Sequence, residues 1–275
     1  MKLMVHSIPP LTGAGAVFTL GGLVLLLTGH RATRPTLRQS RRIAASGVLL
    51  LGAQGLATVA LTELTASLAA VLAATVPLWV AALSMARGAR ITGLALTRLL
   101  AGFLGVVVVL VTAPASALGG SPLAVGGTLT ATLCWALGTL RSADPADAPT
   151  DPRITSAIQM LSGGLVLLAL AGILGQCGGH ALSHVTAGSL GAAAFLLLID
   201  SLAGFALYQH LLQTAPLPLV SSYSYATPIV AAVLSIVIFG DHAWPGLGLG
   251  AAMILVATYS EVRARPGRQL QPPGT

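Results

Sequence analysis

Charged residues are scarce in this sequence of 275 residues. Lys and Arg contribute 14 residues, Asp and Glu contribute 7, and together they make up 8% of the chain. Soluble globular domains are about one quarter charged, because a surface that faces water has to be polar. With 55% of its residues hydrophobic, the chain cannot be an ordinary soluble domain, and its composition favours a protein that lies in a lipid bilayer.

Several kinds of functional motif are also missing. The two cysteines, Cys134 and Cys177, show no metal-ligand spacing with the histidines. Aromatic residues make up only 4% of the chain, so no cage for quaternary cations is evident. The sequence contains no phosphate-binding loop, nucleophile elbow or paired carboxylates. We therefore expect no cofactor, no metal and no enzymatic activity, and we expect a gradient rather than ATP to drive any transport.

Long apolar segments fill most of the sequence. A helix needs about 20 residues to cross the roughly 30 Å hydrocarbon layer of a membrane. Divided at points rich in Gly, Pro and Ser, the apolar sequence predicts an all-α, polytopic bundle of about nine transmembrane helices, over residues 11–29, 43–62, 64–86, 94–113, 119–140, 153–174, 187–208, 216–239 and 244–262.

The basic residues sort to one side of this topology. With nine helices, all 13 Arg fall on one side of the membrane, and the single lysine, Lys2, falls on the other. The positive-inside rule makes the arginine side cytoplasmic, so the C-terminus is expected in the cytoplasm of a cell-membrane protein. The same sorting puts Cys134 and Cys177 too far apart for a disulfide. Because the arginines are scattered between apolar spans, nucleic acid is a poor partner for this charge.

The two halves of the chain resemble each other. Residues 21–26 and residues 163–168 both read GGLVLL, and ATVPLWVAALS around Pro77 is similar to ATPIVAAVLS around Pro228. Both matches occur in the same order, which indicates an internal repeat of the kind that many secondary transporters carry in inverted orientation. We place the first repeat at 1–113 with four helices, the second at 114–263 with five, and a cytoplasmic tail at 264–275. The first repeat is thus expected to lack one helix, the counterpart of 119–140.

These segments are similar to the EamA-type carriers of the drug/metabolite transporter superfamily. The resemblance rests on residues 8–27, 64–83, 129–140, 220–241 and 247–257, and it spans the chain from Ile8 to Arg263. It implies ten helices in two inverted repeats and a solute site between the halves, so that this chain would lack the first helix. One departure is Arg98, which stands where the family usually has Gly.

Asp200 is the one acidic residue deep inside a predicted span, in FLLLIDSLAGF. A charged carboxylate in lipid costs several kcal/mol unless it is paired, protonated or hydrated. We consider two roles: an acid that binds solute or couples transport to protons, and a neutral acid that hydrogen-bonds a neighbouring helix.

Other candidates are polar, aromatic or helix-bending residues within the spans. Gln159, Trp135, Tyr223 and Tyr225 could line a solute path, although packing between helices is the alternative role for each. Tyr223 and Tyr225 lie about 200° apart around a helix, so at most one faces a cavity. The paired positions of Pro77 and Pro228 favour hinges over tolerated kinks.

The function that these observations favour is a secondary transporter. It would move a small metabolite or drug-like solute across the cell membrane by alternating access, with protons as a candidate coupling ion and export as one candidate direction. Two alternatives remain at this point: a membrane enzyme that acts on lipid-like substrates, and a non-transporting membrane scaffold. Substrate and oligomeric state do not follow from the residues.

Overall fold

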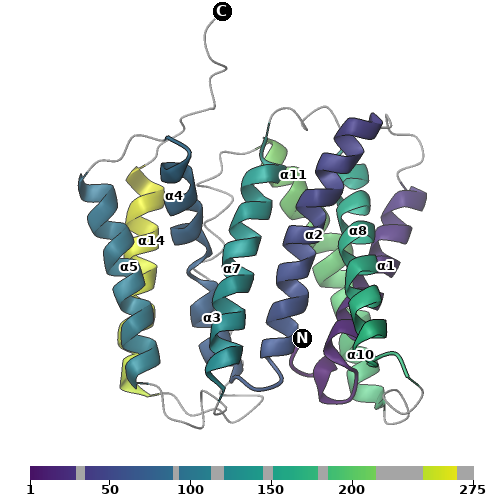
Figure 1. Ribbon diagram of the computed structural model, residues 1–275, viewed down its shortest axis with the longest axis horizontal. Coiled ribbons are helices and arrows are strands. Elements are labelled where there is room, and N and C mark those ends of the chain that lie inside the picture. Colours follow the sequence, from purple (N-terminus) through teal and green to yellow (C-terminus); the bar gives the residue numbers. More distant parts are fainter. Residues whose placement is uncertain are drawn as a thin grey trace, which may run out of the picture. The chain divides into compact units, whose positions relative to one another are not determined.

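The computed structural model describes residues 1–28, 35–88, 93–112, 121–144, 151–178, 185–214 and 244–264. These residues form helices joined by turns, with no strand among them (Figure 1). Six of the helices are long and apolar enough to cross a membrane, and two shorter apolar helices cover Leu100–Val109 and Pro245–Ala257. The expectation of an all-α, polytopic bundle is confirmed. The expected helix 216–239, with Tyr223, Tyr225 and Pro228, lies outside the described residues.

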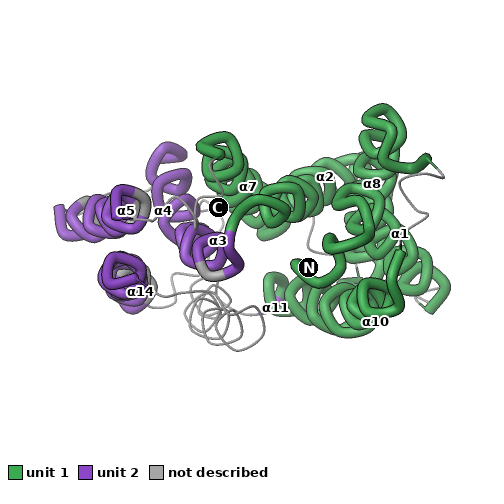
Figure 2. The backbone as a smooth tube through the Cα atoms, turned by 90° about the horizontal axis from the view of Figure 1, so that it is seen from below, with its two compact units in different colours: residues 1–64, 120–213 green, residues 65–119, 214–275 purple. Residues whose placement is uncertain are grey.

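The helices form two compact units (Figure 2). Unit 1 combines residues 1–64 and 120–213, and unit 2 combines residues 65–119 and 214–275. Each unit therefore takes helices from both of the repeats expected from the sequence. Unit 1 contains η1 (Met4–His6), α1 (Pro10–Thr28), α2 (Leu37–Ala60), α7 (Pro122–Ser142), α8 (Pro152–Ile173), α10 (Ala187–Phe195), the π-helix η3 (Leu196–Phe205) and α11 (Ala206–Thr214), whereas unit 2 contains α3 (Ala66–Ala73), α4 (Val76–Ala86), α5 (Gly93–Thr112) and α14 (Pro245–Ala264).

Helix α2 begins six residues before the expected start at residue 43. Thr36 caps it, because the Thr36 side chain accepts from the backbone N–H of Gln39 while the Gln39 side chain accepts from the backbone N–H of Thr36. This reciprocal pair is a capping box, which satisfies two backbone donors at a helix start. Three of the arginines assigned to the preceding loop therefore lie in the first turns of α2: Arg38, Arg41 and Arg42.

The span expected at 64–86 is divided into α3 and α4. Helix α3 ends at Ala73, Thr75 precedes α4 without a side-chain capping bond, and Pro77 is the second residue of α4. Proline fits this position because it has no N–H to donate and the first turn of a helix needs none. The interruption thus falls just before Pro77, and its role as a hinge stays a prediction.

Two pairs of helices cross at close range in a mirrored way. A Cβ atom placed on Gly22 of α1 would lie 3.1 Å from the Ala157 carbonyl oxygen of α8, and one on Gly164 of α8 would lie 3.1 Å from the Gly15 carbonyl oxygen of α1. Gly22 and Gly164 are 142 positions apart, and so are Gly15 and Ala157. The two GGLVLL segments have the same separation, so the two contacts are equivalent under the repeat. In unit 2, Gly105 of α5 and Gly250 of α14 face each other's carbonyl oxygens in the same manner. Small residues allow such close approach of membrane helices.

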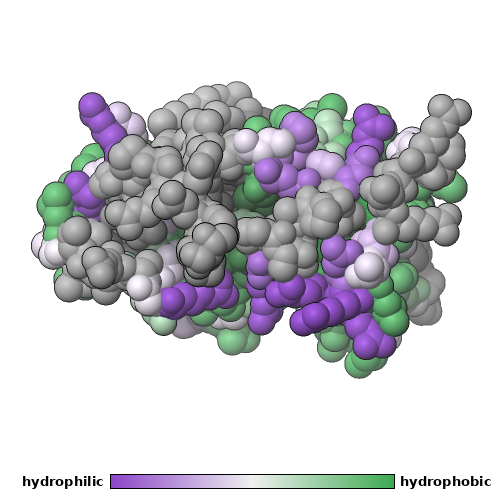
Figure 3. Space-filling model, turned by 90° about the horizontal axis from the view of Figure 1, so that it is seen from above, coloured by the Kyte–Doolittle hydropathy of each residue, from purple (hydrophilic) through white to green (hydrophobic). Residues whose placement is uncertain are grey.

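Unit 1 carries its arginines at one end. Helix α2 begins, α7 ends and α8 begins there, and Arg42 forms an ion pair with Asp144 across 3.2 Å. Figure 3 looks onto this end, where many of the described side chains are hydrophilic. Lys2 lies at the other end, where its Nζ donates to the Leu64 carbonyl oxygen. In unit 2, the Arg98 end of α5 lies beside the Ser260 end of α14. The described arginines of each unit thus lie together, as the sequence predicts.

Candidate functional site

Asp200 lies in the middle of the segment α10–η3–α11, which is helical from Ala187 to Thr214. Its central ten residues form the π-helix η3. In a π-helix the hydrogen bonds run from residue i to residue i+5, and such segments occur frequently at functional sites. Asp200 is neither fully buried nor exposed. Its carboxylate is close enough to the Met1 amino group for the two charges to interact.

A row of positions on one flank of this helix links Asp200 to Tyr208. The buried stripe of the helix consists of Leu196, Ser201, Phe205, Gln209 and Leu212. Three residues come directly before a member of that stripe: Asp200, Gly204 and Tyr208. Because the stripe follows one side of the helix, these three residues lie in a row next to it. Gly204, which is exposed, lies between Asp200 and Tyr208, and these two residues are at most about 12 Å apart along the axis.

Tyr208 joins this flank to helix α7. Its hydroxyl shares a hydrogen bond of 2.8 Å with Thr139 Oγ1, and its ring centroid lies 5.8 Å from that of Trp135. Phe205 adds a third ring, with its centroid 6.4 Å from that of Tyr208. The structure therefore brings Trp135 together with two aromatic residues that the sequence analysis missed. The spacing of eight residues between Asp200 and Tyr208, about two helical turns, places both on one side of a helix, but the contacts of Tyr208 with Thr139 and Trp135 come from helix α7.

The buried stripe contains two polar side chains without a hydrogen-bond partner among the described residues. They are Ser201, through its Oγ, and Gln209, through its Nε2. Ser201 is fully buried, and Gln209 is 1% exposed. Buried polar groups are nearly always hydrogen-bonded, to protein or to ordered water. Both groups are therefore suited to hydrogen-bond ordered water.

Gln159 belongs to a different cluster, nearer the arginine end of unit 1. It is fully buried, and its Nε2 donates to Ser46 Oγ of α2 and to Ser142 Oγ at the end of α7, both at 2.8 Å. The adjacent Ser162 donates to the Ala44 carbonyl oxygen of α2 at 3.1 Å. These bonds tie three helices together. The structure thus places Gln159 in helix packing and separates it from the flank of Asp200.

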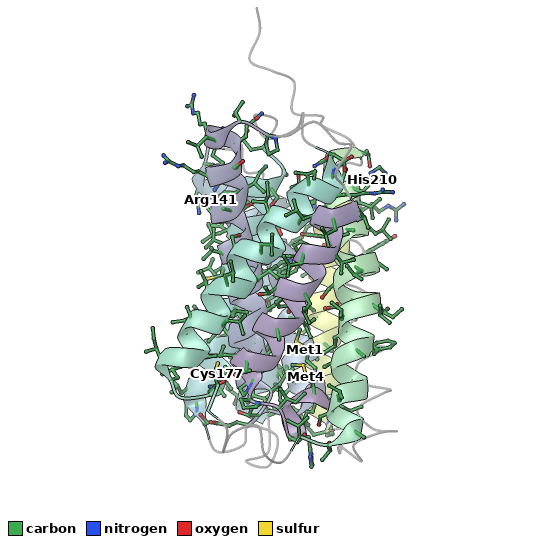
Figure 4. All side chains as sticks on the ribbon, turned by 90° about the vertical axis from the view of Figure 1, so that its right-hand side faces the viewer. Met1, Met4, Arg141, Cys177 and His210 are labelled. Carbon is green, nitrogen blue, oxygen red and sulfur yellow. The ribbon has the colours of Figure 1, made fainter. Side chains whose placement is uncertain are left out.

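The opposite end of unit 1 is covered by residues 1–9, which we call the N-terminal strap. Met4 is fully buried in the core of the unit. Ser189 of α10 donates to the Leu3 carbonyl oxygen at 3.0 Å, and the backbone N–H of Thr186 donates to Ser7 Oγ at 3.0 Å. Figure 4 shows Met1 and Met4 among the helices, with Cys177 at the same end and with Arg141 and His210 at the other. The strap therefore covers the end of the unit remote from its arginines.

The structure offers no metal centre among the residues that it describes: no three His, Cys, Asp or Glu side chains gather there. Cys134 and Cys177 are both free thiols. The polar and aromatic flank of unit 1, with Asp200, Tyr208, Thr139 and Trp135, is the part of the described chain that combines a carboxylate within a membrane-spanning helix with side chains able to contact a solute.

Comparison with known families identifies the chain. A model of the EamA-like transporter family matches residues 1–111 and 123–260. The chain belongs to the EamA-like transporter family. As a member of that family, it is a multi-pass membrane protein that transports small solutes.

Similarity to individual proteins is consistent with membership of this family. The chain is 28% identical over 268 residues to the uncharacterized inner membrane transporter YedA of Escherichia coli strain K12, an alignment that covers 94% of this chain and 84% of YedA. The YedA proteins of Escherichia coli O157:H7 and O6:H1 match to the same extent. A solved crystal structure aligns with a TM-score of 0.67 over 94% of this chain and 90% of the other, at 21% identity, which shows that the fold is shared.

Proposed function

We propose that this EamA-like transporter is a secondary carrier that works by alternating access, with Asp200 as the acid that contacts the solute and its coupling proton. The observation that carries the proposal is the position of Asp200 in a π-helical segment, on the flank shared with Tyr208. A carboxylate in the apolar layer has to be protonated, paired or hydrated. Those same states let an acid bind and release a proton or an amine during a transport cycle.

The surroundings of Asp200 support this role. Trp135, Phe205 and Tyr208 provide aromatic surface, and the buried Ser201 hydroxyl has no described partner. Such a mixture of apolar surface with a few polar groups is typical of small-molecule sites. It favours a solute with an apolar or aromatic body and a basic or polar group.

The proposed topology has the arginine ends of both units in the cytoplasm. The C-terminus, which follows Arg263 of α14, is then cytoplasmic as well. The proposed architecture is two inverted repeats. It is supported by the mirrored crossings of α1 with α8 and of α5 with α14, in which equivalent helices pack antiparallel. Inverted repeats of this kind allow one half of a carrier to rock against the other.

The test is transport by the purified chain in proteoliposomes with an imposed pH gradient. A panel of labelled amino acids and sugars and the cationic dye ethidium identifies a transported probe. We expect Asp200→Asn to reduce its gradient-driven transport at least tenfold and to remove the pH dependence. Asp144→Asn is the matched control, because Asp144 lies at the surface and pairs with Arg42. Equal, equally pH-dependent transport by the Asp200 variant and the wild type would refute the role of Asp200.

The family match does not favour the two alternative functions. An enzyme acting on lipid-like substrates would need clustered acids or histidines, and the described residues contain no such cluster. If the wild-type chain transports none of the panel and instead chemically converts a lipid-like substrate, the enzyme alternative would replace the carrier.

A further inference from the structure

Unit 2 contains a groove of about 500 Å³ between α5 and α14, whereas Asp200 belongs to unit 1. Its polar residues lie at one end: Thr97 and Arg98 on α5, and Ser260 on α14. The rest of the lining is apolar and includes Leu249, Met253 and Val256 of α14. One end of the groove is therefore positively charged, and the rest of its lining is apolar.

The groove lies beside the line along which the two helices approach closely. Gly105 and Gly250 meet at the crossing, where a Cβ atom on Gly105 would lie 2.9 Å from the Gly250 carbonyl oxygen. Beside this crossing, large apolar side chains stay accessible, with Leu249 exposed by 59% and Val256 by 68%. In a membrane protein such an apolar surface is covered by lipid chains or by protein.

The polar end of the groove lies in the leaflet of the arginine ends. Helix α14 covers about 30 Å from Pro245 to Ala264, which is the thickness of the hydrocarbon layer, so the middle of the layer lies near Ile254. The part of the groove from Met253 to Ser260 therefore lies in the half of the membrane that contains Arg98. A long Arg side chain reaches the headgroups from this depth.

The positive charge of Arg98 favours a lipid with an anionic headgroup. Among the side chains that the structure describes, no carboxylate lies within 4 Å of Arg98. A guanidinium presents five N–H donors in a planar fork that fits a phosphate. Beyond Ser260, helix α14 carries Glu261 and Arg263, whose formal charges cancel, so Arg98 is the charged residue among those that line the groove. Basic pockets between membrane helices on the cytoplasmic side bind anionic lipid headgroups.

We propose that this groove binds an anionic phospholipid of the leaflet that faces the arginine ends, with the phosphate at Arg98 and one acyl chain along Met253 and Val256. The proposal goes beyond solute transport and does not depend on the role of Asp200.

The experiment measures lipid binding by native mass spectrometry of the purified full chain in detergent, titrated with phosphatidylglycerol or phosphatidylcholine. We expect phosphatidylglycerol to bind more tightly, and Arg98→Gln to weaken its binding about fivefold, the effect of one Arg near a membrane surface. Arg153→Gln is the control, because Arg153 is exposed at the arginine end of unit 1. It should leave the affinity within twofold of wild type.

A second variant tests the apolar part of the groove without changing charge. Ala252→Trp places a large ring among the lining residues and should weaken phosphatidylglycerol binding while the melting temperature stays within a few degrees. Equal affinity for both lipids, or wild-type affinity in both variants, would overturn the proposal. Displacement of phosphatidylglycerol by an equal concentration of inorganic phosphate would also overturn it, since the site would then recognise phosphate alone.

Discussion

Single glycines determine how closely the helices of unit 1 approach. Gly47 of α2 faces the backbone of α8, where an added Cβ would lie 2.6 Å from the Gln159 carbonyl oxygen. Gly52 of the same helix has no atom within 4 Å of such a Cβ. The two positions therefore have opposite expected responses to the same substitution.

We expect Gly47→Ala to lower the stability of the protein by about 1–3 kcal/mol, because the new methyl group overpacks a helix crossing. Gly52→Ala should instead be neutral or raise stability by about 0.5–1 kcal/mol, because alanine favours the helix where nothing obstructs it. Thermal unfolding in detergent measures both variants. Equal melting temperatures for the two variants would contradict the packing described for α2 and α8.

The Tyr208–Thr139 hydrogen bond is the contact that fixes Tyr208 beside helix α7. Tyr208→Phe keeps the ring and removes the hydroxyl, and Thr139→Val removes the partner. In a double-mutant cycle we expect a coupling energy of about 1 kcal/mol, the typical net contribution of one hydrogen bond. Unfolding by a denaturing detergent provides the free energies. Additive effects of the two substitutions would show that the hydroxyls do not interact.

Sequence reasoning located individual residues unevenly. Asp200 was evident because one acid within an apolar span is a chemical exception. Tyr208 and Thr139 were missed because their importance depends on which helices become neighbours, which single-helix patterns do not reveal. Gln159 was selected as a polar residue in a span, and its two serine partners lie on other helices, Ser46 on α2 and Ser142 at the end of α7, which the sequence of its own span does not reveal.

Among the elements, the interrupted helix α3–α4 is where a conformational change could concentrate. Pro77 follows the interruption at the start of α4. We expect Pro77→Ala to extend the helical hydrogen bonding across the break and to slow transport severalfold without loss of folded protein. Pro122→Ala at the start of α7 is the matched control, because Pro122 occupies a similar position and is exposed. Unchanged transport by the Pro77 variant would remove the hinge role.

The N-terminal strap is a second element with a measurable property. Ser189→Ala removes the donor to the Leu3 carbonyl oxygen, so the strap should open more often. We expect faster hydrogen exchange of the strap amides, including those of Val5 and Ile8, which bond to Met1 and Met4. Thr130→Ala is the control, because the Thr130 hydroxyl bonds within its own helix. Equal exchange in both variants would mean that the strap is held by its apolar contacts.

Most helix positions followed from the apolar composition, because a membrane span has a required length. The start of α2 was misplaced, although the Thr36–Gln39 spacing of a capping box was visible in the sequence. The π-helix η3 could not be foreseen, since its i to i+5 bonding depends on how the segment packs rather than on a residue pattern. The division of the chain into units likewise depends on contacts between distant helices.

At the scale of the whole molecule, the proposed function requires that the chain crosses the bilayer with its arginines at one side. Composition, family and fold agree on the membrane, and within each unit the described arginines lie at one end. An aqueous surface could not be built from 8% charged residues. The sidedness itself can be measured directly.

That measurement is labelling of single cysteines in intact cells with a membrane-impermeant maleimide, in a chain that carries Cys134→Ser. The exposed native Cys177 should react from outside. Arg141→Cys and Arg263→Cys, each combined with Cys177→Ser, should react only after the membrane is permeabilised. Reaction of Cys177 and of either substituted position from the same side of an intact membrane would contradict the account.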